Sequence, residues 1–132
     1  MARVDVIDNV LRSGFDMNEI DWEPWVEPGR KQVDRHMLWA PSEEDPSVGL
    51  LVRFPAGAHG DFHQHLGYEL MLVLDGIIEH SDGRSWPKGT LIVEEPGTYH
   101  SMSSKEGCTF LAIRTHPTQP STPVPPHEQN EG

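Results

Sequence analysis

The sequence predicts an all-β fold, either a sandwich or a barrel built from short strands. Between residues 33 and 114, short apolar runs alternate with turn residues such as Pro55-Ala56-Gly57, Asp75-Gly76 and Pro96-Gly97. No helical period separates these runs, which argues against the βαβ units of a parallel sheet. A length of 132 residues suits one domain with a core of its own.

Residues 1–32 are predicted to form an N-terminal arm rather than a domain. Apolar residues keep helical spacing here only as far as Gly14, and two prolines further on prevent regular structure. Trp22 and Trp25 lie in the extended acidic part of this stretch. Because two large indoles are unfavourable in water, we expect the arm to pack across an apolar face or edge of the barrel.

The segment from 33 to 114 is expected to hold the strands 33–40, 48–54, 62–66, 68–75, 77–80, 90–94, 99–104 and 108–114. The run 68–75 has apolar side chains on both faces, with Glu69 and Asp75 on only one of them. A strand buried on one side would instead show polar residues to water. We therefore expect the second face to be covered by the arm or by a partner subunit, which makes a homodimer the expected assembly.

The C-terminal segment 115–132 holds five prolines among Ser, Thr, Gln and Glu. This composition cannot form a packed core, so the segment is predicted to be a disordered, Pro-rich tail.

The charge balance excludes several classes of partner. Twenty-one acids against ten bases give a formal charge of -11. Nucleic acids and anionic membranes bind clusters of Lys and Arg, so neither is expected here. No apolar run is long enough to span a membrane, and the N-terminus does not resemble a secretory signal, so we expect a cytoplasmic protein. A single cysteine excludes a disulfide framework, whereas eight histidines raise the question of a metal site.

Three histidines and a glutamate have the spacing of a metal site. His63 and His65 are two residues apart, so on a strand both point to the same side. Glu69 follows a short turn at Gly67, and His100 follows a turn further along the chain. Imidazoles and a carboxylate converging from neighbouring strands are suited to a first-row transition metal.

These residues form two motifs that resemble the cupin superfamily. The segment from Gly57 to Gly76 reads G-x5-H-x-H-x3-E-x6-G, which matches the first cupin motif at every defined position. Gly89, Gly97 and His100 match the spacing of the second motif. That motif's proline and asparagine positions hold Glu95 and Ser104 instead, and neither departure affects a ligand.

A closer resemblance covers residues 31–114. The segments 33–38, 51–57, 72–76 and 106–110 look like the ChrR-type cupin group. This group includes the C-terminal half of ChrR-like anti-sigma factors and small dioxygenase-like proteins that act on ketones. Its members usually carry two glutamates after the second histidine, whereas Leu70 follows Glu69 here. Strand alternation points Leu70 away from the site, so we expect the metal to be unaffected.

The resemblance implies a double-stranded β-helix, or jelly-roll barrel, spanning 33–114. It also implies a metal held by His63, His65, Glu69 and His100. One divalent transition metal per subunit is expected, with Fe(II) favoured and Zn, Mn, Ni or Co possible. A small-molecule substrate would take the open coordination positions.

Strand parity suggests which residues line the pocket beside this metal, and a mostly apolar cavity is typical of a small-molecule site. Arg53 and Arg114 could each bind an anionic substrate if they face inward, or could equally be solvated edge charges. The possible pocket-lining residues are Arg53, Met71, Val73, Met102, Ser104 and Phe110.

The remaining histidines are assigned to the surface. His36 and His80 lie at or near strand ends, His59 lies in a Gly-rich turn, and His116 and His127 belong to the tail. No catalytic residue is identified beyond the metal ligands, although His36 or His59 could supply a base. Cys108 is interpreted as a small apolar strand residue without special reactivity.

Three functions fit these features. The first is a metal-dependent enzyme, resembling Fe(II) dioxygenases, on a small ketone, diketone or aromatic substrate. The second is a non-redox metalloenzyme, such as an isomerase, lyase or cyclase, that uses the metal as a Lewis acid. The third is a ligand-sensing module related to anti-sigma cupin domains. Residues 1–32 are too short for the helical zinc domain of those factors and lack its cysteines.

Overall fold

The computed structural model of the protein describes residues 2–27 and 30–130. Residues 1, 28 and 29 of the predicted arm, and 131 and 132 of the predicted tail, lie outside the described residues. The strands are β1 (Glu23–Pro24), β2 (Asp34–Trp39), β3 (Val48–Phe54), β4 (Ala58–His59), β5 (His63–His65), β6 (Glu69–His80), β7 (Ser85–Pro87), β8 (Leu91–Glu94), β9 (Tyr99–His100), β10 (Met102–Ser104), β11 (Cys108–Arg114) and β12 (Thr118–Pro120). The helical segments are the 3₁₀ turn η1 (Phe15–Met17) and α1 (Pro126–Gln129).

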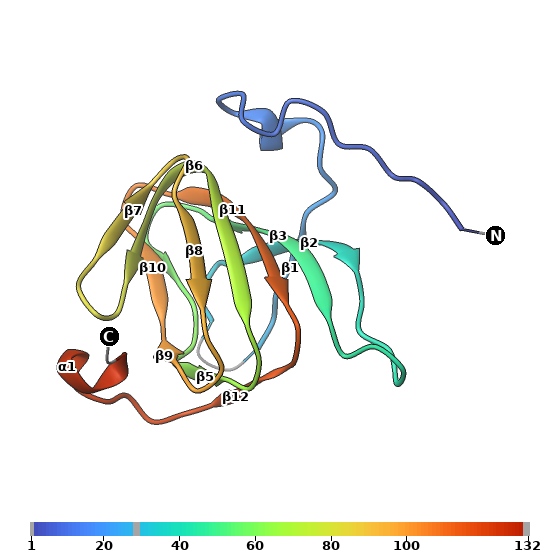
Figure 1. Ribbon diagram of the computed structural model, residues 1–132. Coiled ribbons are helices and arrows are strands. Elements are labelled where there is room, and N and C mark those ends of the chain that lie inside the picture. Colours follow the sequence, from blue (N-terminus) through green and yellow to red (C-terminus); the bar gives the residue numbers. More distant parts are fainter. Residues whose placement is uncertain (1, 28–29, 131–132) are drawn as a thin grey trace.

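Every strand pair is antiparallel, and the strands curl into a barrel (Figure 1). One sheet has the order β1-β2-β3-β11-β6-β10-β4, with β7 and β8 also paired to β6. A second, three-stranded sheet has the order β12-β5-β9 and closes one end. The predicted all-β jelly-roll fold is therefore confirmed.

The long strand β6 replaces the two strands expected at 68–75 and 77–80. Gly76 has a φ of 74°, and a Cβ at this position would lie 2.1 Å from the carbonyl oxygen of Gly107. Only glycine fits such a conformation without strain. The register between β6 and β11 shifts at Thr109 and Phe110, as in a β-bulge, so inward and outward positions exchange along β6.

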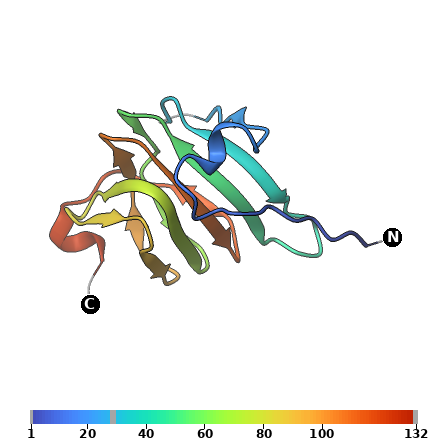
Figure 2. The ribbon, with the colours of Figure 1, turned by 90° about the horizontal axis from the view of Figure 1, so that it is seen from above.

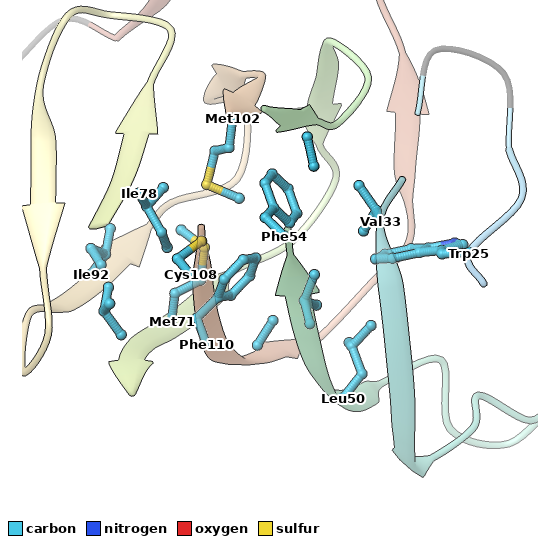
Figure 3. Packing of buried hydrophobic residues seen from close by; sticks show 14 residues of the cluster. Trp25, Val33, Leu50, Phe54, Met71, Ile78, Ile92, Met102, Cys108 and Phe110 are labelled. Atoms are coloured by element: carbon cyan, nitrogen blue, oxygen red, sulfur yellow. The ribbon is translucent and has the colours of Figure 1, made fainter. Parts of the chain in front are cut away.

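The core fills the space enclosed by the barrel strands. Met71, Val73 and Phe110 are at most 2 % exposed and pack with Phe54, whose ring lies edge-on to Phe110 at 5.6 Å (Figure 3). Trp25 of the arm joins this cluster from the side of Val33 (Figure 3).

The N-terminal arm crosses the outer face of the sheet (Figure 2). Phe15 is fully buried against Leu51 and Leu74, and Trp22 packs on the same cluster. The arm thus covers the outer apolar face of the sheet around Leu51 and Leu74. Leu91 and Val93 on β8 remain exposed, and the homodimer stays a prediction. No helix in the described part of the chain is long and apolar enough to cross a membrane.

The segment after Arg114 differs from the disordered tail that we expected. Strand β12 pairs with β5, and the side chain of Gln129, only 5 % exposed, accepts a 2.6 Å hydrogen bond from Ser81. Asn130 exchanges hydrogen bonds with the backbone of Tyr99. Composition predicts disorder because it contains no information about these hydrogen-bond partners, which belong to the barrel rather than to the tail.

Candidate metal centre

The four predicted ligands meet at one end of the barrel. His63 and His65 come from β5, Glu69 from the start of β6, and His100 from β9. All four residues are at most 3 % exposed, and one ligand atom from each lies within 4.8 Å of the others. The three imidazole rings are 4.5 to 5.1 Å apart between centroids. Tight turns at Gly67 and Gly97 bring these strand ends together.

Each imidazole has a polar partner at its Nδ1 atom, through a hydrogen bond for His63 and His65 and through a close carboxylate contact for His100. His63 Nδ1 lies 3.1 Å from the carbonyl oxygen of Asp61, and His65 Nδ1 lies 2.9 Å from the hydroxyl of Thr98. Thr98 gives its own proton to the carbonyl of Glu95, so it accepts from His65. His100 Nδ1 lies 2.5 Å from a carboxylate oxygen of Glu94. These partners assign the proton to Nδ1 in all three rings.

The Nε2 lone pairs consequently converge on Glu69. Its Oε1 lies 3.0 Å from Nε2 of His65 and 3.5 Å from Nε2 of His100. The Nε2 atoms of His63 and His100 are buried without a hydrogen-bond partner. Acceptors that face one another with no proton between them are unfavourable, whereas a cation among them satisfies all of them. The donor set therefore fits a divalent transition metal.

The electrostatics keep the ligands in the forms that bind metals. Burial would raise the pKa of Glu69, but the charge of Arg114, which donates to its Oε2, is the largest opposing cause, and this pKa lies well below the usual value. Burial lowers the pKa of His100 to about 4, although Glu94 opposes that effect. At neutral pH the carboxylate is charged and the imidazole is neutral.

Two residues that support the site were missed in the sequence. Glu94, 7 % exposed, contacts His100, and its other oxygen lies 3.3 Å from Nε2 of His80. Burial would raise the pKa of Glu94, but the hydrogen bonds from the two histidines lower it to about 2. The sequence did contain a signal for Glu94. Along β8, Glu94 lies on the same face as the buried Ile92, so strand alternation predicts that its side chain points inward.

The surface position expected for His80 is wrong, since this residue is only 4 % exposed. We expected a surface position because His80 lies near a strand end, but the register shift beside Leu74 exchanges the two faces of β6 and turns His80 inward. The surface assignments of His59, His116 and His127 are confirmed. His36 is half-buried and contacts the carbonyl of Asp21 on the arm, away from the four ligands.

A cavity of about 10 Å³, roughly the space of one water molecule, lies beside His63 among mostly apolar side chains. Its lining residues are Trp25, Arg30, Leu50, Val52, Phe54, Gly60, Asp61, His63, Met102, Phe110, Ala112 and Arg114. Trp25 and Arg30 come from the arm, and the Arg30 guanidinium stacks on the Trp25 ring at 3.6 Å and lies 2.9 Å from Asp61. The arm thus completes a cavity that the barrel alone leaves unfinished.

Only some of the predicted pocket residues line this cavity. Met102 and Phe110 do, whereas Met71 and Val73 belong to the packed core, and Ser104 is buried with its hydroxyl donated to the carbonyl of Ile77.

Arg53 is a correction, because it lies on the opposite face of β3 from Val52 and Phe54. There it forms a 2.8 Å ion pair with Asp34 and lies over the ring of Trp22. Arg114, on the inward side of β11, lines the cavity in its place.

Comparison with solved structures shows the same fold in several proteins. The acetylacetone dioxygenase of Acinetobacter johnsonii superposes with a TM-score of 0.72 at 18 % identity, covering 92 % of this chain and 78 % of that one. The polyketide cyclase RemF of Streptomyces resistomycificus gives 0.68 at 19 % identity, covering 98 % and 89 %. The complex of Rhodobacter sphaeroides SigE with the anti-sigma ChrR gives 0.63 at 19 % identity, covering 81 % and 59 %.

A comparison with curated proteins found no significant match. The family model of the ChrR cupin-like domain, by contrast, matches residues 12–118. That match includes all four converging ligands, both supporting residues and most of the arm. The chain belongs to the ChrR cupin-like domain family.

Proposed function

We propose that the protein is a metal-dependent enzyme with dioxygenase-like chemistry on a small ketone or diketone. The observation that carries this proposal is the convergence of three buried imidazoles on the carboxylate of Glu69. The similarity in fold to an acetylacetone dioxygenase supports it and suggests a β-diketone as the first substrate to test.

In this proposal His63, His65, Glu69 and His100 hold one divalent transition ion. Fe(II) is favoured for the dioxygenase reaction, while Zn, Mn, Ni and Co suit the same ligands. A bound Fe(II) would supply Lewis acidity and redox chemistry with O2. Asp61, Thr98 and Glu94 orient the three rings through their Nδ1 atoms.

The cavity residues would position the substrate and exclude water. Phe54, Phe110 and Ala112 are apolar and Trp25 closes the side toward the arm, so a short hydrocarbon chain would enter only if these packed side chains move apart. An enclosed site strengthens polar interactions with the reacting group, because little water competes there.

The test uses protein purified without a His-tag. Elemental analysis measures the metal that the protein carries, and oxygen uptake by Fe(II)-loaded protein is followed with acetylacetone. We expect uptake that is lost in His100→Ala and retained in His59→Ala, whose side chain is exposed. Oxygen uptake that survives in His100→Ala would contradict the proposal.

A Lewis-acid enzyme without redox chemistry is the second candidate. The similarity to a polyketide cyclase over 98 % of this chain favours it. Conversion of a polyketone-like substrate by the Zn(II)-loaded protein under nitrogen would support this candidate over the dioxygenase.

A further inference from the structure

The arm leaves part of the outer sheet face uncovered. Leu91 and Val93 of β8 are 61 % and 57 % exposed. Their cross-strand neighbours on β6, Leu72 and Leu70, are apolar as well. A sheet face that meets water normally carries polar side chains, so a row of apolar side chains across two strands indicates a surface that another chain covers.

Strand β8 is also an edge of its sheet. In the described part of the chain it pairs with β6 alone, so the backbone groups along its other side have no strand partner. Proteins commonly protect such an edge with a charged residue, a proline or a covering segment. Residues 91–93 carry neither charge nor proline. The edge can therefore accept one more strand.

The start of the arm is an unpaired segment of similar length. Residues 2–6 are all exposed, with Val4 at 90 % and Val6 at 72 %, and the arm first packs on the sheet at Ile7. The two valines are two residues apart, so in an extended conformation their side chains point to the same side. This segment runs away from the barrel and from β8 (Figures 1 and 2). The arm of the same chain therefore leaves β8 bare.

We propose that the protein forms a homodimer in which residues 2–6 of each copy pair with β8 of the other copy. The added strand satisfies the backbone groups along the edge of β8 and places the two valines of the arm beside Leu91 and Val93. Because the exchange is reciprocal, it closes at two copies and leaves no bare β8 edge in the dimer.

Charge sets the orientation of the added strand. In the antiparallel register Val4 pairs with Val93, and Arg3 then lies beside residues 94 and 95, which are both glutamates. In the parallel register that aligns the valines, Asp8 lies beside these two carboxylates instead. Opposite charges stabilise a cross-strand pair and like charges destabilise it, so the antiparallel register is favoured.

Sedimentation equilibrium of the untagged full chain measures the assembly. We expect about twice the 14.8 kDa of a single chain. Val93→Lys puts a charge on the edge and Val4→Asp puts one on the arm, and each should raise the dimer dissociation constant at least about tenfold. Both positions are exposed in one chain, so circular dichroism should show an unchanged fold. Val26→Lys, at a position 88 % exposed and outside the exchanged segment, is the matched control and should dimerise as the wild type does.

Cysteine pairs test the register and separate exchange from folding back. A chain with Val4→Cys is mixed with a second chain with Val93→Cys under mild oxidation, while the native Cys108 is buried and stays unreactive. We expect a disulfide that joins the two different chains, identified by mass spectrometry. A mixture of Val26→Cys with Val93→Cys is the control and should give no such product.

Three results would overturn the proposal. The first is a wild-type protein that sediments as a monomer at every concentration. The second is a dimer that neither Val93→Lys nor Val4→Asp weakens, because its interface would then lie elsewhere. The third is a disulfide that forms within one chain carrying both Val4→Cys and Val93→Cys but not between the mixed chains, because the arm would then fold back onto its own β8.

Discussion

The carboxylate of Glu94 lies 2.5 Å from Nδ1 of His100 and connects that ring to His80 behind it. This contact leaves Nε2 of His100 with a lone pair directed at the other ligands. A carboxylate behind a ligating imidazole orients the ring and raises its basicity. Glu94 thus positions the His100 ring within the four-residue site.

The variant Glu94→Gln should weaken metal binding, because it keeps the shape of the side chain and removes its charge. We expect the dissociation constant for Zn(II) to rise roughly 10- to 100-fold, as for other such supporting residues. Competition with a chromophoric chelator measures this constant. Glu95→Gln, one residue further on and exposed, is the control and should bind as the wild type does. Equal Zn(II) dissociation constants for the two variants would show that Glu94 does not support metal binding.

Removal of the metal should destabilise the protein. Without a cation, buried acceptors on His63, His100 and Glu69 face one another. At a free metal concentration of 100 times the dissociation constant, binding adds about 2.7 kcal/mol, which corresponds to a shift in melting temperature of roughly 10 °C for a chain of this size. Differential scanning fluorimetry with EDTA and with added Zn(II) measures the shift. Identical melting in both would show that the folded protein does not bind the ion.

Docking of the arm should contribute strongly to stability. Phe15 is fully buried against Leu51 and Leu74, so Phe15→Ala leaves a cavity and should cost about 3 to 5 kcal/mol of unfolding free energy. Urea unfolding followed by tryptophan fluorescence measures it. Met17→Ala, at a position 71 % exposed, should change stability by less than about 0.5 kcal/mol. A small effect at Phe15 would mean that the arm does not pack on the barrel in solution.

Cys108 should resist alkylation in the folded protein. Burial raises the pKa of this thiol to about 12, although a hydrogen bond to Ser104 opposes the effect. The thiolate is the reactive form, so iodoacetamide should react only after unfolding. Mass spectrometry before and after addition of urea checks this. Rapid modification of the native protein would contradict the burial of the thiol.

The same thiol makes stability depend on pH in a defined direction. In the unfolded chain it ionises near pH 8.5, whereas in the folded protein it stays protonated up to about pH 12. Stability is unaffected below pH 8.5 and falls above it, because only the unfolded state loses the proton, by up to about 1.4 kcal/mol per pH unit. Cys108→Ala should lack this part of the slope between pH 9 and 11, which urea unfolding at several pH values can test.

The sequence by itself determined the all-β class, most strand positions and the four converging residues. Strand alternation and turn residues are local signals, and the motif spacing of His63, His65 and Glu69 is a property of the chain alone. Met102 and Phe110, which strand parity predicts to face inward, line the cavity beside His63, although the register between β11 and β6 shifts next to Phe110.

Only the tertiary structure decided which charges face the site. The register shift beside Leu74 reverses parity along β6 and turns His80 inward, toward Glu94. Arg114 shares the parity of Phe110 and faces inward, whereas only the packed sheet shows that Arg53 on β3 faces outward and pairs with Asp34. The ordered segment after Arg114 likewise depends on partners far away in the chain. Each of these outcomes is a pairing between distant residues, and such pairings are decided when the strands pack together.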